Sequence, residues 1–368
     1  MRILIVTSGT GGHFYPALCV AERIKKIHPD SKVFFWSQGP LLRNTEIEGV
    51  VKKDIPSYPF VGMSKTVQFF AIIKTFFLSL KFIPEILRLN PDCLIAFGGH
   101  TSVAPCMSAY MLGITILSHE QNFRAGLTNY LISRFAKFIM TSFPEADPRL
   151  PVNKVVFTGL PIRDDIGKVS VEEAERILGF KKSERTILCF GGSQGAQAIN
   201  ETIWSLLPNL DERYLLIHIT GEQTVPRLKE IKCRYINFKY FKEMSLLYAL
   251  ADLIISRSGA STVFEIIKTG KSAILIPYPG AMSHQKYNAL YLEKLGLGRV
   301  VFQNTLSENL LYNMIKEMFD LNYKNINFNR DELLRLQKID ATKNIIDLVE
   351  KIIERKMINS LWKTLRKI

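Results

Sequence analysis

The chain has 368 residues, of which 47% are hydrophobic and 22% charged, and its formal net charge is +14 at pH 7. At roughly 150 residues per domain this length predicts two domains, and the apolar content excludes a disordered or fibrous protein. The basic excess favours anionic partners such as phosphates, nucleic acid or an acidic membrane surface. The five cysteines form no CxxC pair, which favours a reducing compartment over a disulfide framework.

Two features bear on membrane targeting. The apolar run at residues 3–6 is too short for the core of a signal peptide and passes directly into a glycine-rich loop. No uninterrupted apolar run reaches the ~18–20 residues that a membrane-spanning helix requires. The sequence therefore predicts no spanning segment.

A pattern of strand, glycine turn and helix occurs twice. The apolar run 3–7 precedes glycine-rich residues 8–12 and a helical pattern at 14–27, and the run 186–190 precedes glycine-rich residues 191–195 and a helical pattern through 207. This pattern opens a doubly wound α/β domain. Further buried strands are predicted at 33–36, 93–97, 115–118, 137–141, 215–219, 253–256 and 272–276. Helix-length spacers between most of them predict parallel sheets with right-handed crossovers, and two such domains predict a cleft between them.

The glycine turns are suited to holding an anion, because glycine lets backbone N–H groups approach a phosphate at a helix N-terminus. The first turn is not a dinucleotide fingerprint, since Phe14 stands where the third glycine of G-x-G-x-x-G would be. A dehydrogenase is therefore disfavoured. A tight turn without a ligand is the alternative for one such loop, but a further pair, Gly98 and Gly99, also follows a predicted strand.

Polar residues follow other predicted strands, where ligands of open α/β sheets bind. Residues 119–122 (His-Glu-Gln-Asn) follow the strand 115–118, and a helix start at 258–259 places Glu265 where its carboxylate suits the paired hydroxyls of a ribose. Gln285 and Asn288 follow the strand 272–276 and suit sugar hydroxyls. Helix capping or simple solvent exposure is the alternative for each segment alone. No D-x-D pair, no metal-ligand cluster of His and Cys and no G-x-S-x-G elbow occurs, so neither a metal site nor a cofactor is expected.

Five segments in this order, at 9–13, 119–122, 191–196, 257–260 and 284–289, resemble the peptidoglycan glycosyltransferases that add N-acetylglucosamine to lipid I and so make lipid II. The resemblance covers the chain to about residue 350 and implies a GT-B fold, with two Rossmann-like domains that face a central cleft. It implies an acceptor and membrane-associating domain at 1–163, onto which a helix at about 340–368 packs, and a UDP-sugar domain at 164–339. The reaction implied is an inverting transfer from UDP-N-acetylglucosamine to the C4 hydroxyl of the muramyl sugar.

The resemblance also implies site residues. Near the sugar and diphosphate it places Thr10, Gly11, Gly12, Asn122, Arg163 and Ser193. It places the backbone of Phe241 at the uracil, Glu265 on the ribose and Gln285 on the donor sugar. The nucleotide as a whole is lined by Ala260, Ser261, Thr262, Val263, Phe264 and Glu265. Without a metal, the charge of the departing UDP would be met by N–H groups of the turn 191–195, by its helix end and by Arg163.

An inverting displacement needs a base beside the acceptor hydroxyl. His13 is the preferred candidate, because its ordinary pKa range suits proton transfer and the first loop would face the cleft. Glu120 is the rival candidate.

The segment 67–83 is predicted to be an amphipathic helix. Phe69, Ile73, Phe76, Leu80 and Ile83 share one face, which Lys74 and Lys81 border. Such a helix suits docking in the headgroup region of an anionic membrane, and a buried core helix with snorkelling lysines is the alternative. The segment 351–368 carries six basic residues and would dock on anionic lipid or form a frayed tail. A peripheral location on the cytoplasmic face of the inner membrane follows.

Two other function classes remain open on the sequence alone. A related GT-B enzyme that glycosylates another lipid, such as a diacylglycerol glucosyltransferase, would share the glycine turns and the apolar helix. A nucleotide-binding membrane protein without catalysis would need no base. Nucleic-acid binding is disfavoured, since no recognised module accompanies the positive charge.

Overall fold

The computed structural model describes residues 1–368 except 60–63, 193–194, 229, 281–283, 321–328 and 366–368, and except the side chains of 357 and 359–365. The chain divides into two compact units: unit 1 is Met1–Ile162 with Ile339–Ile368, and unit 2 is Arg163–Lys338. The expected limits, 1–163 with 340–368 and 164–339, differ from these by one residue at each junction.

Unit 1 is built on a seven-stranded parallel sheet with the strand order β3-β2-β1-β4-β5-β6-β7. Its strands are β1 (Arg2–Val6), β2 (Lys32–Ser37), β3 (Val50–Asp54), β4 (Cys93–Ala96), β5 (Thr115–Glu120), β6 (Phe138–Thr141) and β7 (Val155–Phe157). Its α-helices are α1 (Gly11–Ile27), α2 (Pro40–Asn44), α3 (Lys65–Leu89), α4 (Val103–Met111), α5 (Leu127–Ile132) and α13 (Ala341–Leu365).

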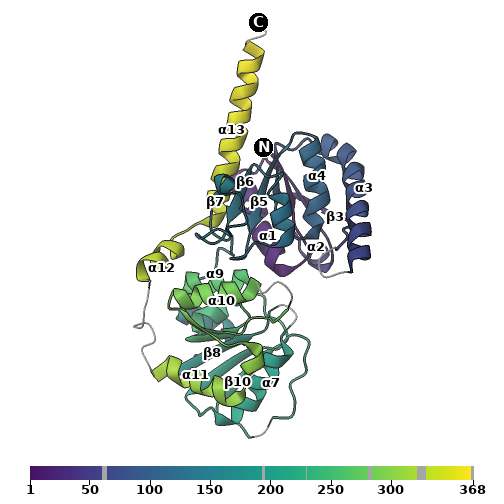
Figure 1. Cartoon of the computed structure of the whole chain (residues 1–368). Helices are drawn as coiled ribbons and strands as arrows, with labels where there is room; N and C mark the ends of the chain where they lie inside the picture. Colours follow the sequence, from purple (N-terminus) through teal and green to yellow (C-terminus); the bar gives the residue numbers. More distant parts are fainter. Residues whose placement is uncertain (60–63, 193–194, 229, 281–283, 321–328, 366–368) are drawn as a thin grey trace. The chain divides into compact units, whose positions relative to one another are not determined.

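Helices cover both faces of this sheet (Figure 1), which is why its central strands read as continuous apolar runs. Ile3 and Ile5 of β1 point to one face and pack with α1 and with Ile345 and Val349 of α13. The alternate residues of β1 point to the other face, where they pack with α3 and α4. The last helix of the chain is thus part of the core of unit 1.

Unit 2 repeats the arrangement with a six-stranded parallel sheet in the order β10-β9-β8-β11-β12-β13. Its strands are β8 (Arg185–Phe190), β9 (Tyr214–Ile219), β10 (Arg234–Phe238), β11 (Leu253–Ser256), β12 (Ser272–Leu275) and β13 (Gly298–Val300). Its α-helices are α6 (Val171–Leu178), α7 (Gln197–Leu206), α8 (Met244–Leu250), α9 (Ala260–Thr269), α10 (His284–Lys294), α11 (Glu308–Asp320) and α12 (Arg330–Gln337). α7 and α11 pack on one face, and Figure 1 shows α9 and α10 on the other.

In both sheets the order in which successive strands are added reverses next to the first strand. This switch point lies between β1 and β4 in unit 1 and between β8 and β11 in unit 2. Ligands of open parallel sheets bind outside the carboxyl ends of the strands at such a switch point. The glycine turns after β1, β4 and β8 and the turn after β11 all lie there. The topology therefore places the predicted motifs of each unit at the position where a ligand is expected.

Four strands were not predicted, namely β3, β7, β10 and β13, and each is the edge of its sheet. Their residues are mostly half-buried or exposed. An edge strand has only one neighbour and is more exposed, so its apolar pattern is weak. The nine predicted strands are the inner strands, which both faces and two neighbours bury.

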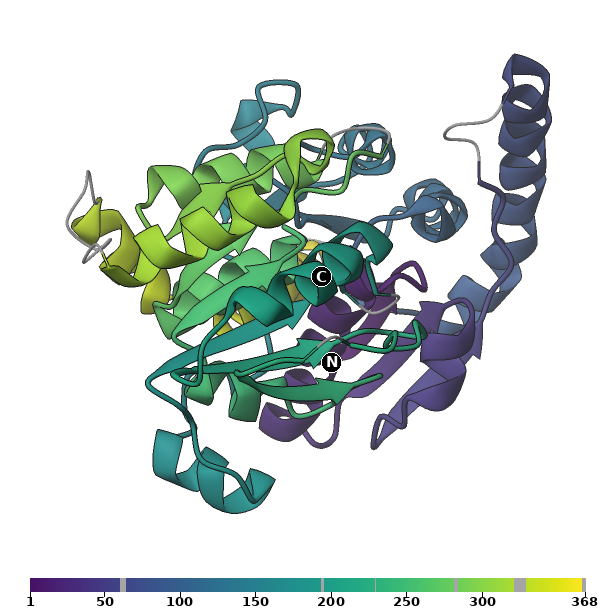
Figure 2. The same ribbon diagram turned by 90° about the horizontal axis from the view of Figure 1, so that it is seen from below.

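The helix α3 lies at the rim of unit 1 beside α4 (Figures 1 and 2). Its inner face buries Ala71, Leu78 and Phe82. Of the predicted apolar face, Phe69 is 61% and Phe76 44% exposed and Leu80 is exposed, whereas Ile73 and Ile83 are half-buried; Phe70 and Phe77 are exposed beside this face. The alternative of a buried core helix is therefore wrong for Phe69, Phe76 and Leu80. Among the described residues, no helix combines the length and the apolar character that crossing a membrane requires.

Candidate active site

Glycines allow three segments of unit 1 to pack against one another at the switch point. A Cβ on Gly9 would lie 2.0 Å from the carbonyl oxygen of Gln38, and one on Gly99 would lie 2.3 Å from the Cβ of Ser8. Gly99 also has a φ of 76°, which side chains rarely tolerate. Glycine is therefore required at both positions, because the turn after β1 packs closely against Gln38, which follows β2, and against the turn after β4.

His13 lies in the first turn of α1 and not in the preceding loop, where it was expected. The helix already begins at Gly11, because the carbonyl of Thr10 accepts the N–H groups of His13 and Phe14. Thr10 and Gly12 are exposed, so the N-terminal N–H groups of α1 are accessible to a ligand. The imidazole of His13 is half-buried, and its Nδ1 lies 2.8 Å from Oε1 of Gln121.

His119 and Glu120 belong to β5, which extends two residues beyond its predicted end because they pair with Met140 and Thr141 of β6. The His119 ring is fully buried, with its Nε2 3.0 Å from the carbonyl oxygen of Gly159 and its Nδ1 3.2 Å from Nε2 of Gln121. Burial lowers the pKa of His119 to about 4, although the bond to Gly159 opposes the shift. The ring is therefore neutral near pH 7.

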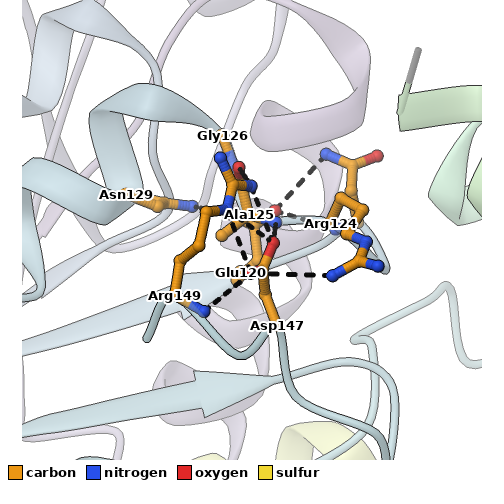
Figure 3. Close-up of polar contacts among 8 residues, drawn as sticks. Glu120, Arg124, Ala125, Gly126, Asn129, Asp147 and Arg149 are labelled. Atoms are coloured by element: carbon orange, nitrogen blue, oxygen red, sulfur yellow. Dashed lines mark hydrogen bonds and ion pairs between the residues drawn. The ribbon is translucent and has the colours of Figure 1, made fainter. Parts of the chain in front are cut away.

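The carboxylate of Glu120 is buried and accepts four hydrogen bonds from the segment that follows it (Figure 3). Oε1 accepts from the backbone N–H and the side-chain amide of Asn122, at 2.9 and 3.4 Å. Oε2 accepts from the N–H of Gly126 at 3.0 Å and from Nδ2 of Asn129 at 2.8 Å. This geometry suits a residue that orders the loop from 121 to 126.

A second carboxylate supports the same loop. Asp147 accepts the N–H of Ala125 and is paired with Arg149, while Arg149 also donates to the carbonyl of Ala125 (Figure 3). Burial alone would raise the pKa of Asp147, but the bonds from Arg149 and Ala125 lower it to about 2. The carboxylate therefore remains charged at every pH at which the protein would work.

The glycine turn after β8 in unit 2 is also sterically required. A Cβ on Gly191 would lie 2.3 Å from the backbone nitrogen of Ala196, and one on Gly195, whose φ is 76°, would lie 2.5 Å from the carbonyl of Thr220. The turn leads into α7, which begins at Gln197. Ser193 lies outside the described residues.

The start of α9 follows β11, with Gly259 as its N-cap. Ala260, Val263 and Phe264 are buried, so only their backbone is available to a ligand. The hydroxyl of Ser261 is also shielded, yet among the described residues it has no hydrogen-bond partner, and the same is true of Nδ1 of His284. An unpartnered hydroxyl in the first turn of a helix is suited to a ligand acceptor.

Glu265 lies later in α9, half-buried, where its Oε2 accepts a hydrogen bond of 2.8 Å from the hydroxyl of Tyr248. Burial raises the pKa of Glu265, and the charge of Arg163 and the Tyr248 bond oppose the rise. Arg163 donates to the carbonyl of Lys242 at 2.6 Å, next to Phe241, whose ring packs on Phe238 at 4.8 Å. Arg163, Phe241 and Glu265 thus belong to neighbouring parts of unit 2.

Gln285 lies in the first turn of α10 and is tied to the end of β12. Its Oε1 accepts the N–H of Tyr278, and its carbonyl accepts the hydroxyl of Ser258. Asn288 is fully buried and donates to the carbonyl of Ser258, so it joins α10 to the β11 turn and does not face a ligand or solvent.

Several residues of these sites were not assigned from the sequence. Gln121 was part of a quoted motif without a role, and Asn129 and Tyr248 carried no signal, because their partners are known only from the fold. The only sequence signal for Gln121 was its position directly after a predicted strand.

Comparisons with known proteins match both units of the chain to one family of glycosyltransferases. Profiles of the glycosyltransferase family 28 N-terminal and C-terminal domains match residues 3–141 and 186–345. A protein of Thermoanaerobacter sp. (strain X514) is 36% identical over 365 residues, covering 96% of this chain and 100% of that protein. Its name is UDP-N-acetylglucosamine--N-acetylmuramyl-(pentapeptide) pyrophosphoryl-undecaprenol N-acetylglucosamine transferase.

A protein of Sulfurihydrogenibium sp. (strain YO3AOP1) with the same name is 33% identical, covering 96% of this chain and 97% of that protein. The crystal structure of Acinetobacter baumannii MurG is similar with a TM-score of 0.70 at 25% identity, covering 95% of this chain and 100% of that one. The fold is GT-B, as expected from the sequence. The chain belongs to glycosyltransferase family 28.

Proposed function

We propose that this chain transfers N-acetylglucosamine from UDP-N-acetylglucosamine to the C4 hydroxyl of the muramyl sugar of lipid I, with inversion, and so forms lipid II. The observation that carries the proposal is the match over 96% of the chain to relatives named for this reaction, together with the five motifs, which follow the carboxyl ends of strands in the two parallel sheets. A glycosyl transfer of this kind needs a base for the acceptor and a site for the nucleotide, and each unit offers one of the two.

Unit 2 is the proposed site of the donor. The N-termini of α9 and α7 would offer backbone N–H groups to the diphosphate. The hydroxyl of Ser261, which has no hydrogen-bond partner in the described part of the chain, would join them. Glu265 would exchange its bond with Tyr248 for two ribose hydroxyls. Arg163 orders the backbone at Lys242, beside Phe241, whose backbone would meet the uracil, and Gln285 would hold the donor sugar.

His13 of unit 1 is the proposed base. Its Nδ1 contacts Gln121, while among the described residues its Nε2 has no hydrogen-bond partner and is available to a hydroxyl. Both oxygens of the rival, Glu120, already accept N–H groups of its own loop. Abstraction of a proton by Glu120 would require breaking these bonds, so we assign Glu120 and Asn122 to the shape of the acceptor loop.

The outer face of α3 is the proposed membrane contact. Phe69, Phe70, Phe76 and Phe77 are exposed on it, and Lys74 and Lys81 are exposed at its borders. Aromatic side chains on one face with lysines at its edges suit a helix that lies in the headgroup region. A lipid-linked acceptor requires such contact, and we place the protein as a peripheral protein on the cytoplasmic face of the inner membrane.

Vesicle flotation tests this face. Phe70→Ser with Phe77→Ser is expected to reduce binding to anionic vesicles several-fold. Val152→Ser, which changes an even more exposed apolar residue elsewhere on unit 1, should leave binding unchanged. Removal of residues 357–368, made separately, measures the share of the basic C-terminal segment. Equal loss of binding in all three proteins, or no binding of the wild type, would contradict the proposal.

A transfer assay tests the reaction itself. The full chain is given radiolabelled UDP-N-acetylglucosamine or UDP-glucose together with a lipid I analogue or diacylglycerol. We expect label to enter the lipid I analogue from UDP-N-acetylglucosamine alone. Transfer of glucose to diacylglycerol would establish the related lipid glucosyltransferase, and donor binding without any transfer would establish a non-catalytic nucleotide-binding protein.

A further inference from the structure

The contact between His13 and Gln121 is the end of a longer chain of hydrogen bonds in unit 1. From the interior outward it runs from the carbonyl of Gly159 to His119, from His119 to Gln121, and from Gln121 to His13, at 3.0, 3.2 and 2.8 Å. His119 and Gln121 are at most 1% exposed, so water does not compete for the two inner links, whereas His13, at the outer end, is half-buried. Each link therefore has a donor and an acceptor that the protein itself fixes.

The direction of the first link follows from the chemistry of a carbonyl. A carbonyl oxygen can only accept, so Nε2 of His119 carries a hydrogen and donates it to Gly159. A neutral imidazole has one hydrogen, which leaves Nδ1 of His119 as an acceptor. Burial lowers the pKa of His119 to about 4, so the ring stays neutral near pH 7. The ring of Phe97 packs against it, with the ring centroids 5.2 Å apart and the planes tilted by 30°.

The second link fixes the amide of Gln121. Its Nε2 donates to Nδ1 of His119 and also, at 3.0 Å, to the backbone carbonyl of His119. The reversed amide would place Oε1 against that carbonyl oxygen, and two acceptors repel. The orientation of this amide is thus determined by two independent acceptors, and Oε1 must face His13.

We infer that Gln121 is a positioning residue for the base: its Oε1 accepts from Nδ1–H of His13 and holds the neutral ring in the tautomer whose Nε2 is unprotonated. The role of Nε2 as a base rests on the proposed function, whereas the assignment of the tautomer does not depend on it. An unconstrained imidazole prefers the opposite tautomer, with its hydrogen on Nε2, in which Nε2 could not act as a base.

The proton balance of the reaction agrees with this arrangement. As the C4 oxygen of the acceptor bonds to the anomeric carbon of the donor, its hydrogen passes to Nε2 of His13, and UDP leaves with the electrons of the broken bond. The resulting imidazolium still donates from Nδ1 to Gln121, so no hydrogen bond of the chain is lost during the step. Burial and, to a smaller extent, the charge of His13 lower the pKa of His100 and of His119.

The direct test is the tautomer of His13 in the full-length protein. Long-range proton–nitrogen correlation spectra of the protein with nitrogen-labelled histidine distinguish the two tautomers of each of its six histidines. The His13 signals are assigned with His13→Gln, at a pH where the ring is neutral. We expect hydrogen on Nδ1 of His13 and on Nε2 of His119. Hydrogen on Nε2 of His13 in the wild type would overturn the inference, whatever the activity.

Gln121→Met tests the role in catalysis, since methionine has nearly the same length and does not accept from Nδ1–H with useful strength. The Nε2–H tautomer of His13 is then expected to dominate, and kcat to fall about 10- to 100-fold, with the Kd of UDP-N-acetylglucosamine unchanged. Ser108→Ala is the control, because it removes a buried hydroxyl that donates to the carbonyls of Ser79 in α3 and Ala104 in α4, outside this chain of hydrogen bonds. It should change neither the tautomer nor kcat.

Gln121→Glu gives a second signature. A carboxylate still accepts from His13, but it cannot donate to His119, so His119 has to move its hydrogen to Nδ1 or take a second proton. A change at His119 with an unchanged His13 tautomer supports the inference, and unaltered His119 signals would contradict it. Failure of the proposed function would appear differently, as a wild type with the expected tautomers but no transfer to lipid I.

Discussion

The two units have the same strand–turn–helix arrangement at the switch point of their sheets, but the side chains there differ in their chemistry. In unit 1 the turn after β1 leads to His13, which two buried side chains connect to the sheet. In unit 2 the turns after β8 and β11 offer helix N-termini, the hydroxyl of Ser261 and the carboxylate of Glu265. We propose that the first arrangement exchanges a proton and that the second holds a phosphate and a ribose.

This difference shows how one scaffold supports two tasks. The backbone N–H groups at a helix N-terminus bind anions in either unit, so the side chains decide what else happens there. A base needs a defined tautomer and therefore buried partners. A nucleotide site needs donors and acceptors left without protein partners. Substitutions in the two units should accordingly affect different kinetic parameters.

The largest effect is expected at the proposed base. His13→Gln should lower kcat for transfer to a lipid I analogue by about 10²- to 10⁴-fold, the usual contribution of a general base. Steady-state kinetics with saturating donor measure this. Near-normal turnover would show that His13 is not the base and would reopen the case for Glu120.

Glu120→Gln should destabilise unit 1 by about 3 kcal/mol, since a buried carboxylate that accepts N–H groups loses charge-assisted bonds and one amide N–H would then face another donor. Hydrogen exchange measured by mass spectrometry should show faster exchange in β5, β6 and the loop 121–126, with unit 2 unchanged. Unaltered exchange with a loss of turnover alone would instead favour Glu120 as the base.

The free energy of unfolding of each unit should depend on pH, because each unit contains a buried histidine. Burial lowers the pKa of His119 in unit 1 and of His218 in unit 2 to about 4. The unfolded chain, with a histidine pKa of about 6.5, binds more protons between these values, so stability is complete above about pH 6.5 and falls as the pH drops. Each histidine should account for about 2 kcal/mol between pH 8 and pH 5.

Urea unfolding at several pH values, with hydrogen exchange to separate the units, measures this slope. His218→Gln should flatten the pH dependence of unit 2 and leave that of unit 1 intact. A slope that the substitution does not change would mean that His218 takes up its proton at the same pH in the folded and in the unfolded chain, contrary to its burial.

The smallest effect is expected at Ser261. Ser261→Ala removes a hydroxyl that has no partner among the described residues, so the free protein should lose little stability. If the hydroxyl binds the donor, the Kd of UDP-N-acetylglucosamine should rise about 5- to 10-fold, or roughly 1 kcal/mol. The same Kd as the wild type would remove Ser261 from the donor site.

The inner strands and the positions of the glycine turns could be predicted from the sequence, because burial on both faces leaves an apolar run and a close approach requires glycine. The edge strands β3, β7, β10 and β13 could not, since exposure weakens their pattern. The start of α1 at Gly11 was missed because glycine favours a turn, whereas here Thr10 provides the first helical acceptor.

The side-chain partnerships of the site were the least predictable part. His13 and Gln121 are 108 residues apart in the sequence, and Glu120 bonds Asn129 only because α5 packs back over the end of β5. Such contacts depend on the topology and on rotamers, neither of which leaves a local pattern. The motif 119–122 pointed to the right place without revealing which residue does what.

The division of tasks between the units is tested most directly by calorimetric titration of UDP-N-acetylglucosamine into His13→Gln and Glu265→Ala alongside the wild type. We predict that His13→Gln binds the donor within about two-fold of the wild type and that Glu265→Ala binds it about 10-fold more weakly. Equal loss of donor affinity in both variants, or wild-type affinity in Glu265→Ala, would contradict the assignment of the nucleotide to unit 2 and of the base to unit 1.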